Sequence, residues 1–436
     1  MNREQIKAEL EQLEGHYVTP DQLCIGLYIH LDLGWMQHPF AFSHFRIKDA
    51  DQLRKIHALN LKQIRYDPKR SDVEPRFSRT IPTQPPVIPP AAPQPTTATP
   101  SKTIHAERVA RLKALTTART AAEKAFSSQS THVREVVRNL AHHPEHAREG
   151  AEKLISGWVS STITESDVAL YAISPGHAGH DAYVHPFNVT VLSLMLAKTL
   201  DMREEEASLA GMAALFHDAG KEEAPRNKSF MDMHCALGAA AAERAGLPKR
   251  VARIIMEHHE YMDGSGYPMR LREDRIDPLA RLVGLVNHFD NLCNPLNPTE
   301  ALTPYEALAV MYATQQSKFD ATILRAFIRC LGVYPPGSIV QLSNDVYAMV
   351  LTANPLKPML PMVMIHAPRV ARETPVILDL GEEKDLTIKK CIRPEHLPKP
   401  VFDYLRPRKC VSYYFLKPGE ANQPDPSPRE AQQKAA

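Results

Sequence analysis

The sequence predicts a mainly α-helical protein with a small β segment towards its C-terminal end and a small α+β domain at its start. Three observations lead to this fold class. A proline-rich stretch separates an N-terminal part with alternating apolar residues from the remainder of the chain. A long central region has apolar residues at helical spacing, and short alternating apolar segments replace that spacing beyond Pro335.

The first 75 residues carry the pattern of a small α+β domain. Apolar residues alternate from Leu23 to Leu31, which is the period of a half-buried strand. Asp49 with Gln52 three positions later predicts the start of a helix, and Ile64 and Tyr66 predict a return strand. We expect a regulatory domain over residues 1–75, because no cluster of ligand-type residues occurs there.

Residues 76–103 are interpreted as a linker, since eight of the nineteen residues from Pro82 to Pro100 are proline and favour an extended polyproline II spacer. Residues 104–170 have apolar residues at helical spacing and are interpreted as connecting helices. Packing of these helices against the following domain is favoured over a homodimer seam, because sustained heptads are absent.

A run of helices is expected from His185 to about Tyr334, within a domain over residues 171–370. The expected ranges are 189–200, 204–216, 232–245, 248–257, 278–292, 304–315 and 321–331. Apolar residues at 340–342 and 346–350 flank Asn344-Asp345 and predict a hairpin, and 363–365 predicts another strand. Residues 371–419 are expected to extend this β segment, and the tail over 420–436 to be disordered.

Composition excludes several classes of function. The 436 residues include 52 Lys and Arg against 50 Asp and Glu, and a net charge of +2 argues against binding a nucleic-acid polymer or a membrane surface through bulk charge. The sequence contains no run of ~18 apolar residues, so we expect no membrane span. The six cysteines include no Cys-x-x-Cys pair, so we expect reduced thiols and a cytoplasmic location.

Histidines gather where the predicted helices begin and end. His217-Asp218 and His258-His259 each end an apolar helix, His185 opens one, and His234 lies near the start of another. A helical bundle builds an internal metal site in this way, and imidazole with carboxylate suits iron, manganese, zinc or nickel. A lone histidine such as His288 or His177 is more often a surface or core residue. Burying five imidazoles without partners would cost a few kcal/mol each, so a metal centre is the economical interpretation.

These residues lie in two long strings that resemble a known family. His217-Asp218-Ala219-Gly220-Lys221 and His258-His259-Glu260, the latter followed by Asp263-Gly264-Ser265-Gly266-Tyr267-Pro268, resemble the HD-GYP branch of the HD superfamily of metal-dependent phosphohydrolases. The N-terminal segment Gly34-Trp35-Met36-Gln37-His38-Pro39-Phe40 is similar to the small domain of unknown function that often precedes HD-GYP domains. The resemblance implies an HD-type helical bundle that hydrolyses cyclic di-GMP to linear pGpG or GMP.

The resemblance also implies a ligand set for two divalent metal ions, iron or manganese. His217 and Asp218 would be the central ligands, with Asp218 bridging the ions. His185 would join them at the first ion, and His234, His258 and His259 would complete the second. A third ion needs a further carboxylate near the first histidine, for which Asp181 is the candidate.

Further roles follow from the same resemblance. Lys221 would hold a substrate phosphate oxygen, and Glu260 would orient a ligand histidine. The loop Asp263–Pro268, including Tyr267, would shape the substrate side and meet diguanylate cyclase partners. Gly264 and Gly266 in this loop permit backbone angles that other residues resist.

Two departures from the family pattern concern the first ion and the substrate. Where the family has a string resembling ADxFDAL, this chain has Val286-Asn287-His288-Phe289-Asp290-Asn291-Leu292, so Asn287 replaces a ligand carboxylate by a neutral amide. Asp290, one helical turn away, is the candidate to compensate as a ligand. The basic string that contacts phosphates in relatives is replaced by residues 293–298, which contain no cation.

Three functions are compared on this basis. The first is a metal-dependent cyclic di-GMP phosphodiesterase, which two nearly complete motif strings favour. The second is a catalytically weakened protein that binds cyclic di-GMP or a cyclase partner without turnover, motivated by Asn287 and the missing cations. The third is an HD phosphohydrolase of another nucleotide, against which the Gly-Tyr-Pro loop argues.

Overall fold

The computed structural model describes residues 16–31, 44–57, 59, 61, 63–68, 70–75, 102–163, 169–173, 183–221, 233–354, 357–371, 375–383, 385–407 and 411–416. The chain divides into two compact units, residues 1–101 and residues 102–436. The segment Gly34–Phe40, His177, Asp181, most of the proline-rich linker and the tail lie outside the described residues.

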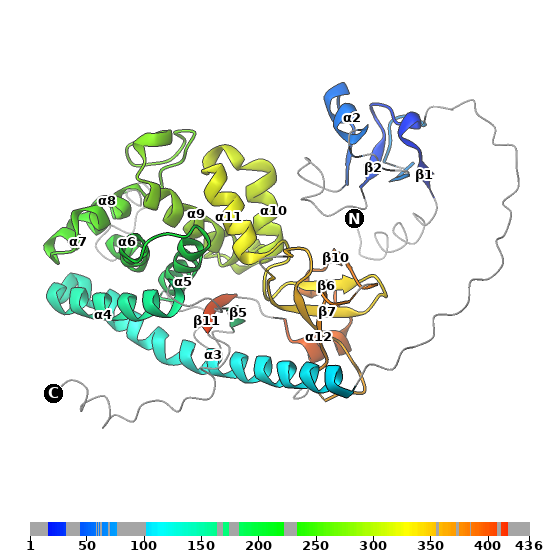
Figure 1. Ribbon diagram of the computed structural model, residues 1–436. Helices are drawn as coiled ribbons and strands as arrows, with labels where there is room; N and C mark the ends of the chain where they lie inside the picture. Colours follow the sequence, from blue (N-terminus) through cyan, green and yellow to red (C-terminus); the bar gives the residue numbers. More distant parts are fainter. Residues whose placement is uncertain are drawn as a thin grey trace, which may run out of the picture. The chain divides into compact units, whose positions relative to one another are not determined.

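In its described residues, the N-terminal unit has a four-stranded antiparallel sheet and a helix (Figure 1). The sequence predicted the helix and two of the strands, and it missed the other two. The strands are β1 (Tyr17–Val18), β2 (Tyr28–His30), β3 (His44–Arg46) and β4 (Ile64–Tyr66), in the order β1-β4-β2-β3, and the helix is α2 (Ala50–His57). The amide of Gln52 donates to Asp49 Oδ1 at 2.8 Å, which confirms the predicted helix start. Strand β2 is shorter than the apolar alternation because Gly26, at φ +101°, turns the chain ahead of it.

The second unit contains the predicted run of helices (Figure 1). They are α3 (Lys102–His142), α4 (Pro144–Ile163), α5 (Val184–Thr199), α6 (Glu204–Phe216), α7 (Met233–Arg244), α8 (Lys249–Glu257), α9 (Pro278–Cys293), α10 (Pro304–Thr314) and α11 (Ala321–Leu331), with a 3₁₀ turn η4 at Ala219–Lys221. Six of the seven ranges expected between His185 and Tyr334 agree within one residue. Helix α5 begins five residues before the expected range, which places His185 in its first turn.

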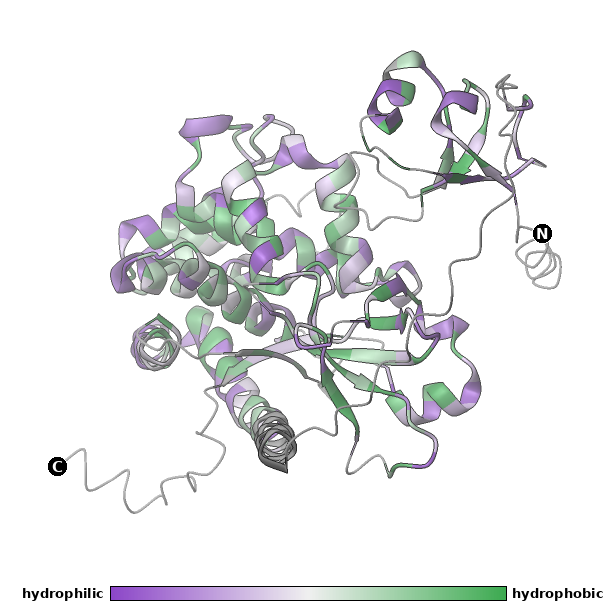
Figure 2. Cartoon of the chain, turned by 45° about the vertical axis from the view of Figure 1, so that its right-hand side comes forward, coloured by the Kyte–Doolittle hydropathy of each residue, from purple (hydrophilic) through white to green (hydrophobic). Residues whose placement is uncertain are grey.

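Helix α5 is the central helix of this unit. Its residues from Pro186 to Ala197 are all buried, and α4, α6, α9 and α11 pack against it. A helix that is apolar all round belongs in the core, whereas α4 and α11 each have one buried and one exposed face. Figure 2 shows the mixed pattern of the outer helices, several of which change between green and purple along the ribbon.

The predicted hairpin is confirmed and belongs to a five-stranded antiparallel sheet with the order β10-β6-β7-β8-β9. Its strands are β6 (Ile339–Leu342), β7 (Tyr347–Thr352), β8 (Met362–Ile365), β9 (Ile377–Asp379) and β10 (Ile388–Cys391), followed by α12 (Lys399–Leu405). The expected domain boundary between residues 370 and 371 is wrong, because it would divide this sheet between β8 and β9.

A two-stranded ribbon joins distant parts of the second unit. Strand β5 (Ala169–Ile173) pairs antiparallel with β11 (Ser412–Leu416), and β11 packs against α5. We expected residues 104–170 to be helical, but the start of β5 falls within that range because its partner lies more than 200 residues later in the chain. The five cysteines that the structure describes are free thiols, and none of the described helices is long and apolar enough to cross a bilayer.

Asp277 fixes the start of α9, the helix that carries Asn287 and Asp290. Its carboxylate accepts hydrogen bonds from the Leu279 amide at 2.9 Å and from Arg250 Nε and Nη2 at 2.9 and 3.1 Å. Burial by itself raises the pKa of Asp277, but the Arg250 and Leu279 hydrogen bonds outweigh it and hold the pKa below its usual value.

We predict that Asp277→Ala destabilises the second unit by about 1–3 kcal/mol, since a helix cap and a charged hydrogen bond are lost. Because the folded pKa is lowered, this contribution is complete above the unfolded pKa of about 3.9 and is lost as the pH falls through the folded value. Urea denaturation followed by far-UV circular dichroism at pH 7 and at pH 3 measures both effects. Asp274→Ala is the control, because Asp274 is fully exposed and, within the part of the chain that the structure describes, its one ion pair is with Arg281 at 3.3 Å. An equal loss at both pH values would contradict the assignment.

Candidate metal centre

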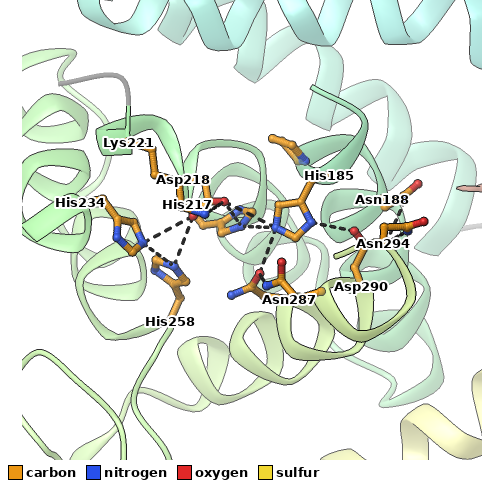
Figure 3. Close-up of polar contacts among 12 residues, drawn as sticks. His185, Asn188, His217, Asp218, Lys221, His234, His258, Asn287, Asp290 and Asn294 are labelled. Atoms are coloured by element: carbon orange, nitrogen blue, oxygen red, sulfur yellow. Dashed lines mark hydrogen bonds and ion pairs between the residues drawn. The ribbon is translucent and has the colours of Figure 1, made fainter. Parts of the chain in front are cut away.

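The first group of candidate ligands lies where α5 begins and α6 ends (Figure 3). His185 Nε2 is 3.1 Å from His217 Nε2, and Asp218 Oδ2 is 3.6 and 3.5 Å from these two nitrogens. His217 Nδ1 donates to the carbonyl of Ala214 at 2.7 Å, one turn earlier in the chain. The Nε2 atom of His217 therefore presents its lone pair towards Asp218.

The second group lies between η4, α7 and the end of α8. His234 Nε2 and His258 Nε2 lie 3.5 and 3.9 Å from Asp218 Oδ1, and 3.4 Å from each other. His258 Nδ1 donates to the carbonyl of Ile255 at 2.6 Å, so its Nε2 also faces the carboxylate as a lone pair. His259 completes the group, and its ring stacks on Tyr267 with a centroid distance of 4.5 Å.

All six predicted histidine and aspartate ligands thus converge in two groups that share Asp218. The ligand atoms of His185, His217 and Asp218 lie within 4.8 Å of one another, and so do those of Asp218, His234, His258 and His259. Each oxygen of Asp218 faces a different group (Figure 3).

Close backbone contact brings the two groups together. A Cβ added to Gly220 would lie 2.1 Å from the carbonyl oxygen of His234 and 2.5 Å from the amide nitrogen of Gly238. Only glycine lets η4 approach α7 this closely, and the approach sets Asp218 beside His234.

The protonation states suit a cation. Burial lowers the pKa of His217 to about 4, and burial with the neighbouring histidines lowers the pKa of His258 and His259 well below the usual value. Burial alone would raise the pKa of Asp218, but His217, Lys221 and His185 hold it well below its usual range. Neutral imidazoles around an ionised carboxylate are the donors that a divalent metal ion requires.

Asp218 itself indicates that a partner belongs in this centre. Its Oδ1 is buried without a hydrogen-bond donor among the described residues, and such an atom costs free energy unless a cation or donor meets it. Its Oδ2 accepts from Lys221 Nζ at 2.5 Å. The donor set and the unpartnered oxygen together fit a divalent metal ion.

The two acceptors predicted on α9 have different roles. Asn287 is buried, and its Oδ1 lies 3.0 Å from His185 Nε2, so it belongs to the first group. The expectation that Asp290 is a ligand is wrong. Asp290 Oδ2 accepts from His185 Nδ1 at 2.6 Å, on the side of the ring away from His217, and therefore orients the histidine from behind (Figure 3).

The hydrogen bond from His185 to Asp290 also changes the charge of the imidazole. Burial by itself lowers the pKa of His185, but the hydrogen bond to Asp290 and the charges of Asp290 and Asp218 raise it above its usual value overall. A cation at Nε2 must therefore compete with a proton.

Glu260 does not orient a ligand histidine, which corrects the expectation from the motif. Its two oxygens accept the backbone amides of Met269 at 2.6 Å and Leu271 at 2.9 Å, so Glu260 closes the loop that contains Tyr267 and Pro268. Asp263 accepts from the Ser265 amide at 2.9 Å and from Ser317 at 3.0 Å, which ties the loop to the segment after α10.

The two glycines of the loop are needed for different reasons. Gly264 has φ +77°, as predicted for a position that other residues resist. Gly266 has no such angle, and that part of the prediction is wrong. Instead, an added Cβ at Gly266 would lie 2.4 Å from the carbonyl oxygen of His259 and 2.5 Å from Glu260 Cα. The loop therefore lies directly against the backbone of the histidine pair.

Sequence reasoning missed Asn188 and Asn294, which donate to Asp290 Oδ1 at 2.8 and 2.9 Å. The signal for Asn188 was available, because a fully buried amide in an otherwise apolar helix requires hydrogen-bond partners. It also missed that His288 Nε2 donates to Gln315 Oε1 at 2.7 Å and that the Tyr261 hydroxyl donates to His288 Nδ1 at 3.0 Å. These hydrogen bonds give this histidine a structural role.

We predict that Gly266→Ala weakens divalent-metal binding and destabilises the second unit by about 1–3 kcal/mol, because the new methyl group pushes on the backbone at His259. Titration calorimetry with Mn²⁺ and urea denaturation measure the two effects. The control is Gly157→Ala in α4, where an added Cβ meets nothing within 4 Å and should stabilise the helix by about 0.5–1 kcal/mol. Unchanged metal affinity in Gly266→Ala would show that the contact is not needed.

Comparisons with known proteins agree with this architecture. Residues 17–151 match the model of a domain of unknown function, DUF3391, and residues 135–323 match the model of the HD domain. The chain is 24% identical over 346 residues to the cyclic di-GMP phosphodiesterase PA4108 of Pseudomonas aeruginosa, which covers 76% of this chain and 80% of that protein.

Two further relatives match only over shorter regions. The cyclic di-GMP phosphodiesterase response regulator RpfG of Xanthomonas campestris is 32% identical over 151 residues, covering 31% of this chain and 39% of that protein. The 3′3′-cGAMP-specific phosphodiesterase 3 of Vibrio cholerae is 26% identical over 195 residues, covering 42% of this chain and 41% of that protein. The chain thus spans about two fifths of the length of these two relatives.

Proposed function

Because this chain is an HD-domain protein with a DUF3391 domain ahead of its HD domain, we propose that it is a metal-dependent phosphodiesterase that hydrolyses cyclic di-GMP. The relative that matches over most of both chains carries that activity in its name. Hydrolysis of one phosphodiester gives linear pGpG, and hydrolysis of both gives GMP.

The observation that carries this proposal is the placement of one carboxylate between two groups of imidazoles. The HD domain implies a bound divalent metal ion, and the two groups supply donors for two such ions. His185, His217 and Asp218 would hold the first, and Asp218, His234, His258 and His259 the second. When bound, two divalent ions supply a nucleophile from water near neutral pH and neutralise charge on a phosphate.

Residues of the chain supply the remaining functions. Lys221 is partly exposed, and its ammonium group has two further donors besides the one on Asp218, so it can bind a non-bridging phosphate oxygen. Asp290 keeps a proton on His185 Nδ1, which leaves Nε2 as the ligand atom. No side-chain nucleophile is required, because water attacks the phosphorus in line with the departing 3′ oxygen.

Imidazole and carboxylate donors support iron or manganese as the resident ions. The same donors accept zinc or nickel, so metal content of the purified protein distinguishes these metals. The exposed part of the loop, Pro268 to Arg270, is the surface we assign to a diguanylate cyclase partner on the basis of the family resemblance.

Binding of cyclic di-GMP without hydrolysis is the alternative, and the relatives do not favour it, since each is named a phosphodiesterase. The structure also keeps the donors of the second group complete. Asn287 replaces the carboxylate of the family pattern by a neutral amide, but its oxygen still lies beside His185 in the first group. This change weakens the binding of the first ion without removing the donor.

We predict that Asp218→Ala abolishes both hydrolysis of cyclic di-GMP and binding of both ions, because both groups lose their shared carboxylate.

Lys221→Ala should retain two ions and lose about 10- to 1000-fold in the rate of hydrolysis, the scale of one electrostatic donor at a reacting phosphate. Chromatographic product analysis on Mn²⁺-loaded protein and metal analysis by mass spectrometry give the two readouts. 3′3′-cGAMP serves as the competing substrate. Full activity of Asp218→Ala would refute the proposed centre.

A second prediction concerns Asn287. Replacement by Asp adds a negative charge at the first group and should tighten the first ion by about 1–3 kcal/mol, the scale of a charge-assisted contact over a neutral one. Without metal, the same variant should be less stable than wild type, because Asp218 and Asp290 lie nearby. Mn²⁺ titrations followed by calorimetry and by cyclic di-GMP hydrolysis test both statements. No leftward shift of the titration would exclude Asn287 as a ligand.

A further inference from the structure

A chain of hydrogen bonds links the C-terminal strand to the first candidate ligand. The backbone of Val411, directly before β11, bonds to the side chains of Asn188 and Asn294. Both asparagines bond to Asp290, and Asp290 bonds to His185 (Figure 3). We propose that Asn188 and Asn294 are positioning residues, through which the docking of β11 onto α5 sets the orientation of His185 for the first ion. This inference rests on the proposed function, since it requires that His185 holds a metal ion.

We call the hydrogen bonds that run from Val411 through Asn188 and Asn294 to Asp290 and His185 the relay, and Asp290 is its centre. Its side chain is fully buried, so an ionised carboxylate there needs hydrogen bonds to offset its lost hydration. Oδ2 accepts from His185 Nδ1 at 2.6 Å, and Oδ1 accepts from Asn188 and Asn294 at 2.8 and 2.9 Å. The two asparagines thus occupy one oxygen and leave the other to the histidine.

Strand β11 determines which way each asparagine amide points. The Val411 carbonyl accepts from Asn188 Nδ2 at 3.2 Å and from Asn294 Nδ2 at 3.0 Å. The Val411 amide donates to Asn294 Oδ1 at 3.2 Å, and the Tyr413 amide donates to Asn188 Oδ1 at 3.4 Å. Both amides therefore present nitrogen to Asp290. The reversed orientation would place an amide oxygen against the carboxylate and a nitrogen against a backbone donor.

The strand is held firmly enough to act as a support. It pairs with β5 over five residues, and Tyr414 stacks on Phe187, two positions after His185, with a centroid distance of 5.9 Å. Trp158 contacts Phe187 and Phe415 edge to face at 5.3 and 6.0 Å. The backbone and the ring of His185 are thus fixed by the same strand, the first through Phe187 and the second through the asparagines.

The test measures binding of Mn²⁺ to the full chain by titration calorimetry and metal content after dialysis. Asn294→Ala, at a half-buried position, and Asn188→Ala should each weaken the first ion by 10- to 100-fold, the usual effect of losing a partner that orients a ligand histidine. The second ion should bind nearly as in wild type, because among the described residues none of the hydrogen bonds of Asn188, Asn294 and Asp290 reaches His234, His258, His259 or Asp218. Asn297→Ala is the matched control, since Asn297 lies three residues further along and its side chain bonds, among the described residues, to Thr299 and Glu300 alone.

A double-mutant cycle separates positioning from general destabilisation. In an Asp290→Asn background, the loss caused by Asn294→Ala should disappear, because the effect passes through the carboxylate. Equal weakening of both ions, or an undiminished loss in the Asp290→Asn background, would overturn the relay and show a structural role. If both asparagine variants bind two ions with the affinities of the wild type, the relay is overturned and the proposed function is unaffected. A wild-type protein that binds no divalent ion would overturn the proposed function together with it.

Discussion

The structure depends on keeping one buried carboxylate, Asp218, ionised between two sets of imidazoles. Burial opposes that charge, and the surrounding residues compensate by holding the pKa of Asp218 well below its usual range. The same burial removes the charge from His217, His258 and His259. A single environment thus yields an anion surrounded by neutral donors, which is the arrangement that a pair of cations would complete. The convergence of α5, α6, α7 and α8 can be understood as the means of building that environment.

Two polar residues in the core of the second unit, Asn188 and Thr190, are tolerable because they meet hydrogen-bond partners. Asn188 lies in the apolar helix α5 and uses both ends of its amide, on Asp290 and on the backbone around β11. Thr190, in the same helix, donates to the carbonyl of Pro186 at 2.7 Å. Since unpartnered polar groups in a core are costly, the hydrogen bonds of Asn188 constrain α5, α9 and β11 to one mutual arrangement. This constraint gives the first ligand, His185, a defined position.

The sequence predicted what depends on local pattern and on motif strings. Helical periodicity gave the ranges of the central helices, and the turn residues Asn344-Asp345 gave the hairpin, because both signals lie within a few neighbouring residues. The pairing of β5 with β11 was not predictable, since neither segment has a partner nearby in the chain. The roles expected for Glu260 and Asp290 were wrong for the same reason: motif position identified carboxylates near the histidines, but only the packing shows which histidine or backbone amide each one meets.

The two halves of the centre differ in their supply of negative charge. Asp218 Oδ2, which faces the first group, is shared with Lys221, and the other oxygen donor there is the neutral amide of Asn287. Asn291 donates to that same amide oxygen at 2.7 Å and draws further electron density from it. Asp218 Oδ1, which faces the second group, has no competing donor among the described residues. The second group therefore attracts a cation more strongly than the first. Occupancy of the first site then depends on how well its ligands are oriented. The contact between Asp290 and His185 therefore contributes more to the affinity for the first ion than it would if a second carboxylate were a ligand there.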